Sequence, residues 1–467
     1  MRFLIALWGS KFLMLINKIK GQERDDFPGL LAFKIDPDFL KKVAKPRDVV
    51  VVSGTNGKTT TSTFINNYFA QKKGLKTSYN DWGANAHAGF CVNFLRGVNI
   101  FNKCKTDMSV IEADEMTLDF SLPRMKPNYT VVTNICKDSL RRNAHPEYIF
   151  SHMDRAIRTA KPLAILNAND PISSQLGAGS DVERVFFSME DPDLKPYDNK
   201  SKDIRICPYC GADIQYNYRI YRHIGDFYCP KCGFKTPEAK YVASNVNLKA
   251  RTMDVTDGGV TMTYNLPSDT IYFTSNILAA IAMLREYGES REDIRDFFRT
   301  QQLPDIRQSC VEYGGTEYYT YCAKGQNISA ASVAFEQLAN DPTDKVIVLC
   351  VDEVQDKNHP LETVSWLYES DYELLARPNI RKVVCTGHMG LAHKLRLLLA
   401  GVPEDRILWA ENDEDIPAAA YTEGVDGVYI LFETDNVTKS KNWRDAIVAY
   451  AKSLKGDAAA ADGKEVK

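Results

Sequence analysis

The chain has 467 residues, of which 44% are hydrophobic and 25% are charged, and it carries a formal net charge of −3 with a sequence pI of ≈ 6.2. Such a chain can form about two to four globular domains, each with its own core. Proteins that bind nucleic-acid backbones are usually basic over at least one domain, so this balance argues against a nucleic-acid partner.

Cysteine usage indicates a reducing compartment. The chain has 11 cysteines, an odd number, and most of them are scattered singly, which does not fit a disulfide framework. Cys136, Cys350 and Cys385 lie in apolar runs, where cysteine usually acts as a small buried hydrophobe. We therefore expect a cytoplasmic protein.

The opening segment MRFLIALWGSKFLMLINKIKG is expected to form a helix within an N-terminal lead-in of residues 1–40. It has no small-residue cleavage site and no run of about 20 uncharged apolar residues, so we expect neither a signal peptide nor a spanning helix. Two interpretations stay open. The helix packs on the protein, which we favour, or it lies peripherally at the inner face of the membrane with its apolar face in lipid. In the second case Arg2, Lys11, Lys18 and Lys20 would lie near headgroups.

Residues 41–305 alternate short apolar runs, such as RDVVVVS, DMSVIEADE and PLAILNANDP, with helical patterns such as PEYIFSHMDRAIRTA. This alternation predicts an α/β domain with a mainly parallel sheet, whose functional loops gather at its carboxyl edge. VTDGGVTMTYNLPSDTIYFTS is expected to add antiparallel strands. The alternation resumes in a second, Rossmann-like α/β domain at 306–455, and the small, charged tail 456–467 is expected to be disordered.

SGTNGKTTT follows the first apolar run and opens a helix, which is the context of a phosphate loop. Two glycines let backbone N–H groups approach an anion at a helix N-terminus. A lysine can reach terminal phosphates, and the threonine after it can bind Mg²⁺. The predicted ATP site comprises Gly54, Thr55, Asn56, Gly57, Lys58, Thr59 and Thr60.

Two Cys-x-x-Cys pairs, Cys207/Cys210 and Cys229/Cys232, predict a Zn²⁺ ribbon inserted at about 203–236. Four thiolates leave no open position on the metal, so the zinc should be structural rather than catalytic. His223 lies between the pairs among aromatic residues, and we expect it to pack within the ribbon rather than to bind metal. The segment is only mildly basic, so nucleic acid is not its expected partner.

The loop Gly-Thr-Asn-Gly-Lys-Thr-Thr resembles that of the Mur ligases, which use ATP to form an acyl phosphate on a carboxylate that an amine then attacks. The resemblance implies a Mg²⁺ ligand in IEADE, nucleotide contacts in NANDP and TSNILAA, and an interdomain arginine facing ATP in DIRQ. The residues concerned are Glu112, Asn167, Asn169, Asp170, Asn276 and Arg307.

The inserted ribbon and the segment FPGLLAFKIDPDFL narrow the resemblance to the MurT family. GANAHAGF, TNICKDSL and KVVCTGHMGLAHKLRLLLAGVPEDRI resemble further segments of that family. The resemblance implies amidation of the D-glutamate α-carboxylate in the stem peptide of lipid II at the membrane surface. It also implies ammonia supplied by a class I, GatD-like glutaminase subunit in a heterodimer.

One motif departs from the family. MurT proteins carry a catalytic Asp two residues before Ser-Trp, whereas this chain has Thr363 before Ser365. Glu362 is our first candidate, and Asp356 our second, for the carboxylate that orients or deprotonates ammonia. The departure leaves two alternatives open: a Mur-type ligase that adds an amino acid to a cell-wall precursor, and a nucleotide-binding scaffold without amidation chemistry.

Overall fold

The computed structural model describes residues 1–22, 25–80, 83–137, 145–193, 198–268, 270–301, 308–323, 327–351, 364–433, 436–454 and 465–466. The chain divides into two compact units, which we describe separately. The first unit comprises Met1–Cys136, His145–Pro196 and Asp203–Gln302. The second unit comprises Lys137–Ala144, Tyr197–Lys202 and Leu303–Lys467.

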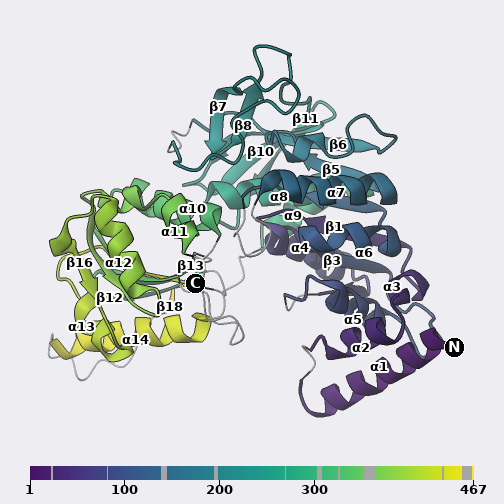
Figure 1. Ribbon diagram of the computed structural model, residues 1–467, viewed down its shortest axis with the longest axis horizontal. Coiled ribbons are helices and arrows are strands. Elements are labelled where there is room, and N and C mark those ends of the chain that lie inside the picture. Colours follow the sequence, from purple (N-terminus) through teal and green to yellow (C-terminus); the bar gives the residue numbers. More distant parts are fainter. Residues whose placement is uncertain are drawn as a thin grey trace. The chain divides into compact units, whose positions relative to one another are not determined.

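The first unit is built on a nine-stranded sheet of order β11-β10-β9-β6-β5-β4-β1-β3-β2 (Figure 1). Its strands are β1 (Asp48–Ser53), β2 (Thr77–Tyr79), β3 (Met108–Glu112), β4 (Tyr129–Val132), β5 (Leu163–Asn167), β6 (Arg184–Met189), β9 (Tyr241–Asn247), β10 (Thr252–Asp257) and β11 (Val260–Asn265). The strands from β2 to β9 pair in parallel, and β10 and β11 complete the sheet in antiparallel pairs. The predicted α/β class with a mainly parallel sheet is confirmed.

Helices cover both faces of this sheet. They are α1 (Arg2–Ile19), α2 (Phe27–Ile35), α3 (Phe39–Lys42), α4 (Lys58–Asn67), α5 (His87–Gly97), α6 (Leu118–Met125), α7 (Pro146–Ala160), α8 (Ile271–Tyr287) and α9 (Arg291–Phe298). Val49 and Val51 of β1 share a core with α5, α6 and α7, while α4 and α8 pack together on the opposite face. Within the described ranges, no helix is long and apolar enough to cross a membrane.

One expected strand is a helix. β10 and β11 form the predicted hairpin, but α8 already begins at Ile271, inside the stretch TIYFTS. Isoleucine, tyrosine and phenylalanine favour strands by propensity. Here the turns that follow are buried on nearly every side from Thr274 to Leu284, and a helix buried all round shows no clear periodicity in sequence.

The order of the parallel strands brings four loops together. β5, β4, β1 and β3 are neighbours, so the chain leaves all four at the same edge of the sheet. These exits carry the phosphate loop after β1, the acidic segment after β3, residues 133–136 after β4 and the segment Ala168–Asp170 after β5.

The cysteine-rich insertion lies between β6 and β9. It contains a two-stranded antiparallel sheet of β7 (Gln215–Tyr221) and β8 (Ile224–Tyr228). Cys207, Ile214, Phe227 and Cys229 form a small core of their own. The insertion is therefore a compact module in the connection between two parallel strands.

The second unit holds a seven-stranded sheet of order β16-β15-β14-β17-β13-β12-β18. Its strands are β12 (Gln308–Tyr313), β13 (Thr316–Cys322), β14 (Lys345–Cys350), β15 (Ile380–Cys385), β16 (Ile407–Trp409), β17 (Gly427–Phe432) and β18 (Glu465–Val466). Its α-helices are α10 (Ile328–Asn340), α11 (Ser365–Glu369), α12 (Gly390–Leu399), α13 (Ile416–Ala420) and α14 (Val437–Leu454). β16 to β13 are parallel, and β12 and β18 are antiparallel additions. β18 lies in the tail 456–467, which the sequence predicts to be disordered, so this prediction does not hold for Glu465–Val466.

Candidate active site

The phosphate loop turns sharply between β1 and α4, and two glycines make the turn. Gly54 has φ 122° and Gly57 has φ 89°, conformations that side chains rarely adopt. A side-chain carbon at Gly54 would collide with Thr133 Oγ1, and one at Gly57 would collide with Asn276 Oδ1. Only glycine therefore fits at these two positions. The N-terminus of α4 begins directly after the turn, and a helix N-terminus is the part of a helix that binds anions.

The segment after β4 fixes the loop by hydrogen bonds. The N–H of Thr55 donates to the carbonyl of Asn134 at 2.8 Å, and the N–H of Asn56 donates to Asn134 Oδ1 at 3.2 Å. Thr133 Oγ1 donates to the carbonyl of Asn56 at 2.6 Å. The N–H of Cys136 donates to Thr55 Oγ1 at 3.0 Å. Asn56 and Thr55 are thus held from a strand that lies far away in sequence.

Lys58 places a positive charge directly beside the loop. Its Nζ donates to the carbonyl of Gly54 at 2.6 Å and lies 3.2 Å from Glu115 Oε2. The Lys58 side chain is 13% exposed and that of Glu115 only 2%, so this ion pair is largely shielded from water. An ammonium group at this position can neutralise phosphate charge, as the phosphate-loop prediction requires.

Thr59 and Glu112 face each other across the same edge of the sheet. Thr59 Oγ1 donates to Glu112 Oε1 at 3.1 Å. Asn80 holds the end of β3 in place, because its Nδ2 donates to the carbonyl of Glu112 at 2.8 Å and its Oδ1 accepts from the N–H of Glu112 at 2.9 Å. A hydroxyl and a carboxylate oxygen are ligands that Mg²⁺ prefers, usually together with several waters.

The three predicted residues at the end of β5 and directly after it are buried supports of the loops. Asn167 Nδ2 donates to the carbonyl of Thr133 at 3.0 Å, and Asn169 Oδ1 accepts from the N–H of Met189 at 2.7 Å. Asp170 accepts from the N–H of Ile135 at 2.8 Å. Their side chains therefore contact protein backbone, and they fix the segment that in turn fixes the phosphate loop.

Asn276 reaches the loop from α8. Its side chain borders Gly57, and its carbonyl accepts a hydrogen bond from Thr61 Oγ1 at 3.2 Å. The sequence prediction placed this residue near ATP, and it does lie against the loop. The other predicted residue of this group, Arg307, lies outside the described residues.

A buried ion cluster links the β7–β8 hairpin to the segment after β5. His223 Nδ1 lies 3.0 Å from Asp203 Oδ2, and His223 Nε2 lies 3.2 Å from Asp170 Oδ1. Arg222 Nε also pairs with Asp203 at 2.9 Å. Burial alone would lower the pKa of His223, but Asp203 and Asp170 outweigh it and raise that pKa to about 9. The imidazole is thus a cation held between two carboxylates.

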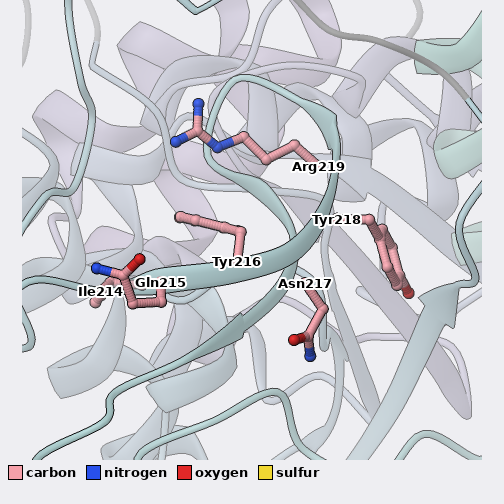
Figure 2. A pocket seen from close by; sticks show the side chains of 6 residues that line it. All are labelled: Ile214, Gln215, Tyr216, Asn217, Tyr218 and Arg219. Atoms are coloured by element: carbon pink, nitrogen blue, oxygen red, sulfur yellow. The ribbon is translucent and has the colours of Figure 1, made fainter.

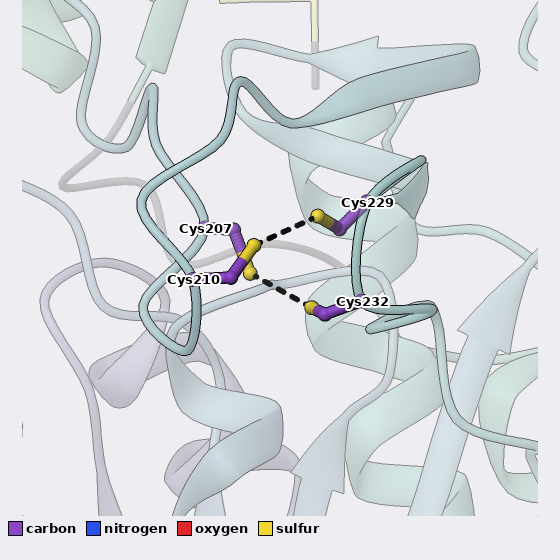
Figure 3. A group of neighbouring side chains, drawn as sticks. All are labelled: Cys207, Cys210, Cys229 and Cys232. Atoms are coloured by element: carbon purple, nitrogen blue, oxygen red, sulfur yellow. Dashed lines mark hydrogen bonds between the residues drawn. The ribbon is translucent and has the colours of Figure 1, made fainter.

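The four cysteines of the ribbon converge on one point. Figure 3 shows Cys207 and Cys210 on one turn facing Cys229 and Cys232 on another. The Sγ atoms of Cys207 and Cys232 lie 3.5 Å apart, as do those of Cys210 and Cys229, and all four lie within 4.8 Å of one another. His223 is not among them; it lies in the buried ion cluster with Asp203 and Asp170.

This donor set fits Zn²⁺. Zinc binds thiolates at ~2.3 Å in a tetrahedron, which corresponds to sulfur–sulfur separations of roughly 3.8 Å. The N–H of Cys232 lowers the pKa of the Cys229 thiol to about 6, whereas the N–H of Phe234 is outweighed by burial and the neighbouring thiols, which raise the pKa of Cys232 to about 12. Each turn is closed by a backbone hydrogen bond, from Gly211 to Cys207 at 2.9 Å and from Gly233 to Cys229 at 3.1 Å.

A separate cavity of ≈ 360 Å³ lies along β7 and is lined by residues 214–219 (Figure 2). The guanidinium of Arg219 lies 4.9 Å from the ring centre of Tyr216. Its lining includes none of the phosphate-loop residues, so it is distinct from the predicted nucleotide site.

In the second unit, the two candidate carboxylates Glu362 and Asp356 lie outside the described residues, as does Thr363. The chain is described again from Val364, and α11 begins at Ser365. Trp366 is only 2% exposed and packs edge-on to His393, with ring centres 6.0 Å apart. The Ser-Trp end of this segment is therefore anchored in a core.

Solved structures with the same fold are ligases of cell-wall peptides. A pseudomurein peptide ligase type C from Methanothermus fervidus superimposes with a TM-score of 0.65 at 20% identity, covering 88% of this chain and 81% of that chain. MurF from Acinetobacter baumannii gives 0.63 at 14% identity, covering 90% and 80%. MurF from Thermotoga maritima, solved in complex with ADP, gives 0.60 at 15% identity, covering 91% and 85%. Residues 52–221 also match the Mur ligase middle domain family. These matches define the fold as that of the Mur ligases, with a phosphate loop at the strand edge.

The remaining comparisons narrow this class. Residues 326–434 match the MurT ligase C-terminal family. The chain is 30% identical over 405 residues to the MurT subunit of lipid II isoglutaminyl synthase (glutamine-hydrolyzing) from Staphylococcus aureus strain COL, covering 86% of this chain and 89% of that one. It is 26% identical to the MurT subunit from Streptococcus pneumoniae strain R6, covering 86% and 88%. The chain therefore belongs to the MurT family, and the resemblance seen in the sequence is confirmed.

Proposed function

We propose that this protein amidates the D-glutamate α-carboxylate in the stem peptide of lipid II, using ATP to form an acyl phosphate that ammonia attacks. The observation that carries the proposal is the identity of 30% to a MurT subunit over 86% of the chain. The reaction consumes ATP and ammonia and yields the amide, ADP and phosphate. Phosphorylation is needed because a carboxylate has no good leaving group.

The phosphate loop has the role of holding ATP in this proposal. The N-terminus of α4, which follows Gly57, faces the phosphates in this proposal, and Lys58 neutralises their charge. Mur ligases use ATP together with Mg²⁺, and Thr59 and Glu112 would hold that ion. Asn276 borders the loop, and Arg307 is assigned to ATP by family resemblance alone. The phosphate loop is held indirectly by the backbone contacts of Asn167, Asn169 and Asp170.

The four ribbon cysteines are proposed to bind one structural Zn²⁺. Zinc would supply a cross-link between the two turns that carry Cys207/Cys210 and Cys229/Cys232. The hairpin of the ribbon also carries His223, which forms an ion pair with Asp170. Asp170 in turn accepts a hydrogen bond from Ile135, in the segment that holds the phosphate loop. A metal-fixed ribbon would therefore stabilise the nucleotide site without taking part in the reaction.

Ammonia is proposed to come from a partner, a class I glutaminase subunit of the GatD-like type, in a heterodimer. An acyl phosphate hydrolyses in water, so a protected path between subunits is the chemically favoured delivery. Glu362 is the first candidate, and Asp356 the second, for the carboxylate that receives ammonia in this proposal. Since lipid II is membrane-linked, we place the reaction at the inner face of the membrane.

The test measures amidated lipid II by mass spectrometry. Reactions contain the full chain, ATP, Mg²⁺ and lipid II, with either the glutaminase and glutamine, or ammonium alone, or single amino acids. We expect amidated product in the first reaction and, at high ammonium, in the second, with Lys58→Ala as the inactive control. Product only with an amino acid would establish the amino-acid ligase instead. If no reaction gives product, the remaining interpretation is a nucleotide-binding scaffold without amidation chemistry.

A further inference from the structure

Helix α1 is apolar on two faces. Its inner face carries Ala6, Leu7 and Ser10, all fully buried. Its outer face exposes six large apolar side chains: Leu4 (43%), Ile5 (52%), Trp8 (53%), Phe12 (63%), Leu15 (55%) and Ile19 (78%). At 3.6 residues per turn these six fall within an arc of about 100°, so they form one continuous stripe. Single exposed apolar residues are ordinary, but a contiguous patch marks an interaction site.

The helix is firmly attached to the first unit. The Phe3 ring stacks on Phe39 with ring centres 5.4 Å apart, and Trp8 Nε1 donates to the carbonyl of Ile100 at 2.8 Å. Lys11 Nζ donates to the carbonyls of Leu95 and Val98 near the end of α5. Figure 1 shows α1 along α2, with the chain's N-terminus at its end. The outer stripe is thus presented by a docked helix.

A rigid turn extends the stripe. Ile100 and Phe101 are 53% and 73% exposed, next to Trp8. Asn99 Oδ1 accepts from the N–H groups of Phe101 and Lys103, both at 2.9 Å. Asn102 Oδ1 accepts from the N–H of Ala44 at 2.9 Å, which ties the turn to the body of the unit. Two large apolar side chains are therefore held outside the core by side-chain hydrogen bonds.

The two segments that form this patch carry charges of one sign, while Asp25, whose Oδ2 accepts from Asn17 Nδ2 at 2.7 Å, lies at the end of α1 outside the stripe. Residues 1–22 and 98–106 contain no Asp or Glu. Arg2 and Lys20 fall on one side of the helical stripe and Lys18 on the other, and all three are exposed. Lys103 and Lys105 are exposed beside the turn. Lys11 does not lie near headgroups as the membrane interpretation of the sequence expects. Its Nζ binds carbonyls of the protein, and burial lowers its pKa to about 8.

We infer that the outer face of α1 together with the Ile100–Phe101 turn docks on an anionic lipid bilayer. We call this the docking face. Its apolar stripe would enter the acyl boundary, and the exposed basic residues on its border would meet anionic headgroups. Trp8, with its N–H already bonded, suits the interfacial depth at which tryptophan gathers. This inference is independent of the ligase chemistry, but docking would confine the enzyme to the surface that carries a lipid-linked acceptor.

The experiment measures binding of the full chain to vesicles without lipid II, so that it does not depend on the proposed reaction. Vesicles of equal parts phosphatidylcholine and phosphatidylglycerol are compared with phosphatidylcholine alone by co-sedimentation. The test variant carries Phe12→Ser and Leu15→Ser. The matched control carries Leu395→Ser and Leu399→Ser on α12, which are also exposed (51% and 63%) and four residues apart. Circular dichroism melts verify that both variants fold.

We expect the wild type and the control to bind anionic vesicles, more weakly as salt rises, and the test variant to partition at least about tenfold less. Lys18→Gln with Lys20→Gln should weaken binding to anionic vesicles and leave the remainder less salt-sensitive. Equal partitioning of the test variant and the wild type, or no binding to anionic vesicles at low salt, overturns the inference. If the wild type forms a dimer and does not bind vesicles, and the test variant is a monomer, the docking face binds a second copy of the chain instead.

Discussion

Replacing His223 by glutamine is expected to destabilise the first unit in a pH-dependent way. The His223 cation lies between Asp203 and Asp170, 3.0 Å and 3.2 Å away, and all three side chains are almost fully buried. Glutamine keeps a polar group of similar size but removes the positive charge. Asp203 would keep its ion pair with Arg222, but Asp170 would lose its contact with the imidazolium, and unpaired buried charge is costly.

The size of the pH-dependent part follows from the pKa of His223. Burial lowers this pKa, yet the two carboxylates raise it from 6.5 to about 9. At 1.36 kcal/mol per pKa unit, the raised value contributes roughly 3 kcal/mol to the free energy of unfolding. Because the folded-state pKa is the higher one, this contribution is complete below about pH 6.5 and is lost as the pH rises through about 9.

Calorimetry of the full chain can test this sign and size. The transition of the first unit is identified as the one that Mg·ATP shifts, and wild type and His223→Gln are compared from pH 6 to about 10. The difference in the free energy of unfolding between wild type and variant should be largest at pH 6 and should shrink by roughly 3 kcal/mol as the pH rises to about 10. His145→Gln is the control, because that side chain is 63% exposed. A wild-type advantage that stays constant over this range would refute a charged, buried His223.

Lys58→Ala should lower ATP turnover by a factor on the order of 10³, because the Lys58 charge serves phosphate. It should also lower the melting temperature, because the buried carboxylate of Glu115 loses this ion pair. Unchanged Mg·ATP affinity and turnover would contradict the loop assignment. Elemental analysis should find one zinc per chain, and Cys229→Ser should lose it and destabilise the β7–β8 module, whereas zinc-free protein of equal stability would argue against a metal site. Glu362→Gln should abolish amidation yet keep ATP binding; if it remains fully active and Asp356→Asn does not, the second candidate carries the role.

Local sequence predicted the parts of the site that local chemistry determines. The turn at Gly54 and Gly57, the lysine after it and the paired cysteines all lie within short motifs, and the structure brings each set together. The role of Glu112 is an inference from family resemblance, because an acidic strand end alone is equally typical of a solvated loop start. Parallel topology places Glu112 opposite Thr59.

Other parts of the site depend on contacts that no single segment reveals. Asn80 follows β2 and holds Glu112 at the end of β3, which depends on the pairing of β2 with β3. Asn134 follows β4 and holds Asn56 after β1, which depends on the pairing of β1 with β4. His223 could be predicted to be packed, but its ion pair with Asp170 joins two segments whose proximity only the tertiary fold defines. The start of α8 was missed because burial overrides the strand propensity of its first residues.

The position of the zinc module has a consequence for how the first unit folds. β6 and β9 are adjacent parallel strands, and the chain between Met189 and Tyr241 must return across the sheet before β9, β10 and β11 can add to its edge. In most parallel sheets an amphipathic helix makes this return. Here the cysteine-rich module is part of it, so ligation of the proposed zinc by its four thiolates would shorten the loop that has to close. The availability of zinc would then govern the order of assembly, with the last three strands joining late and remaining open to proteases in metal-starved protein.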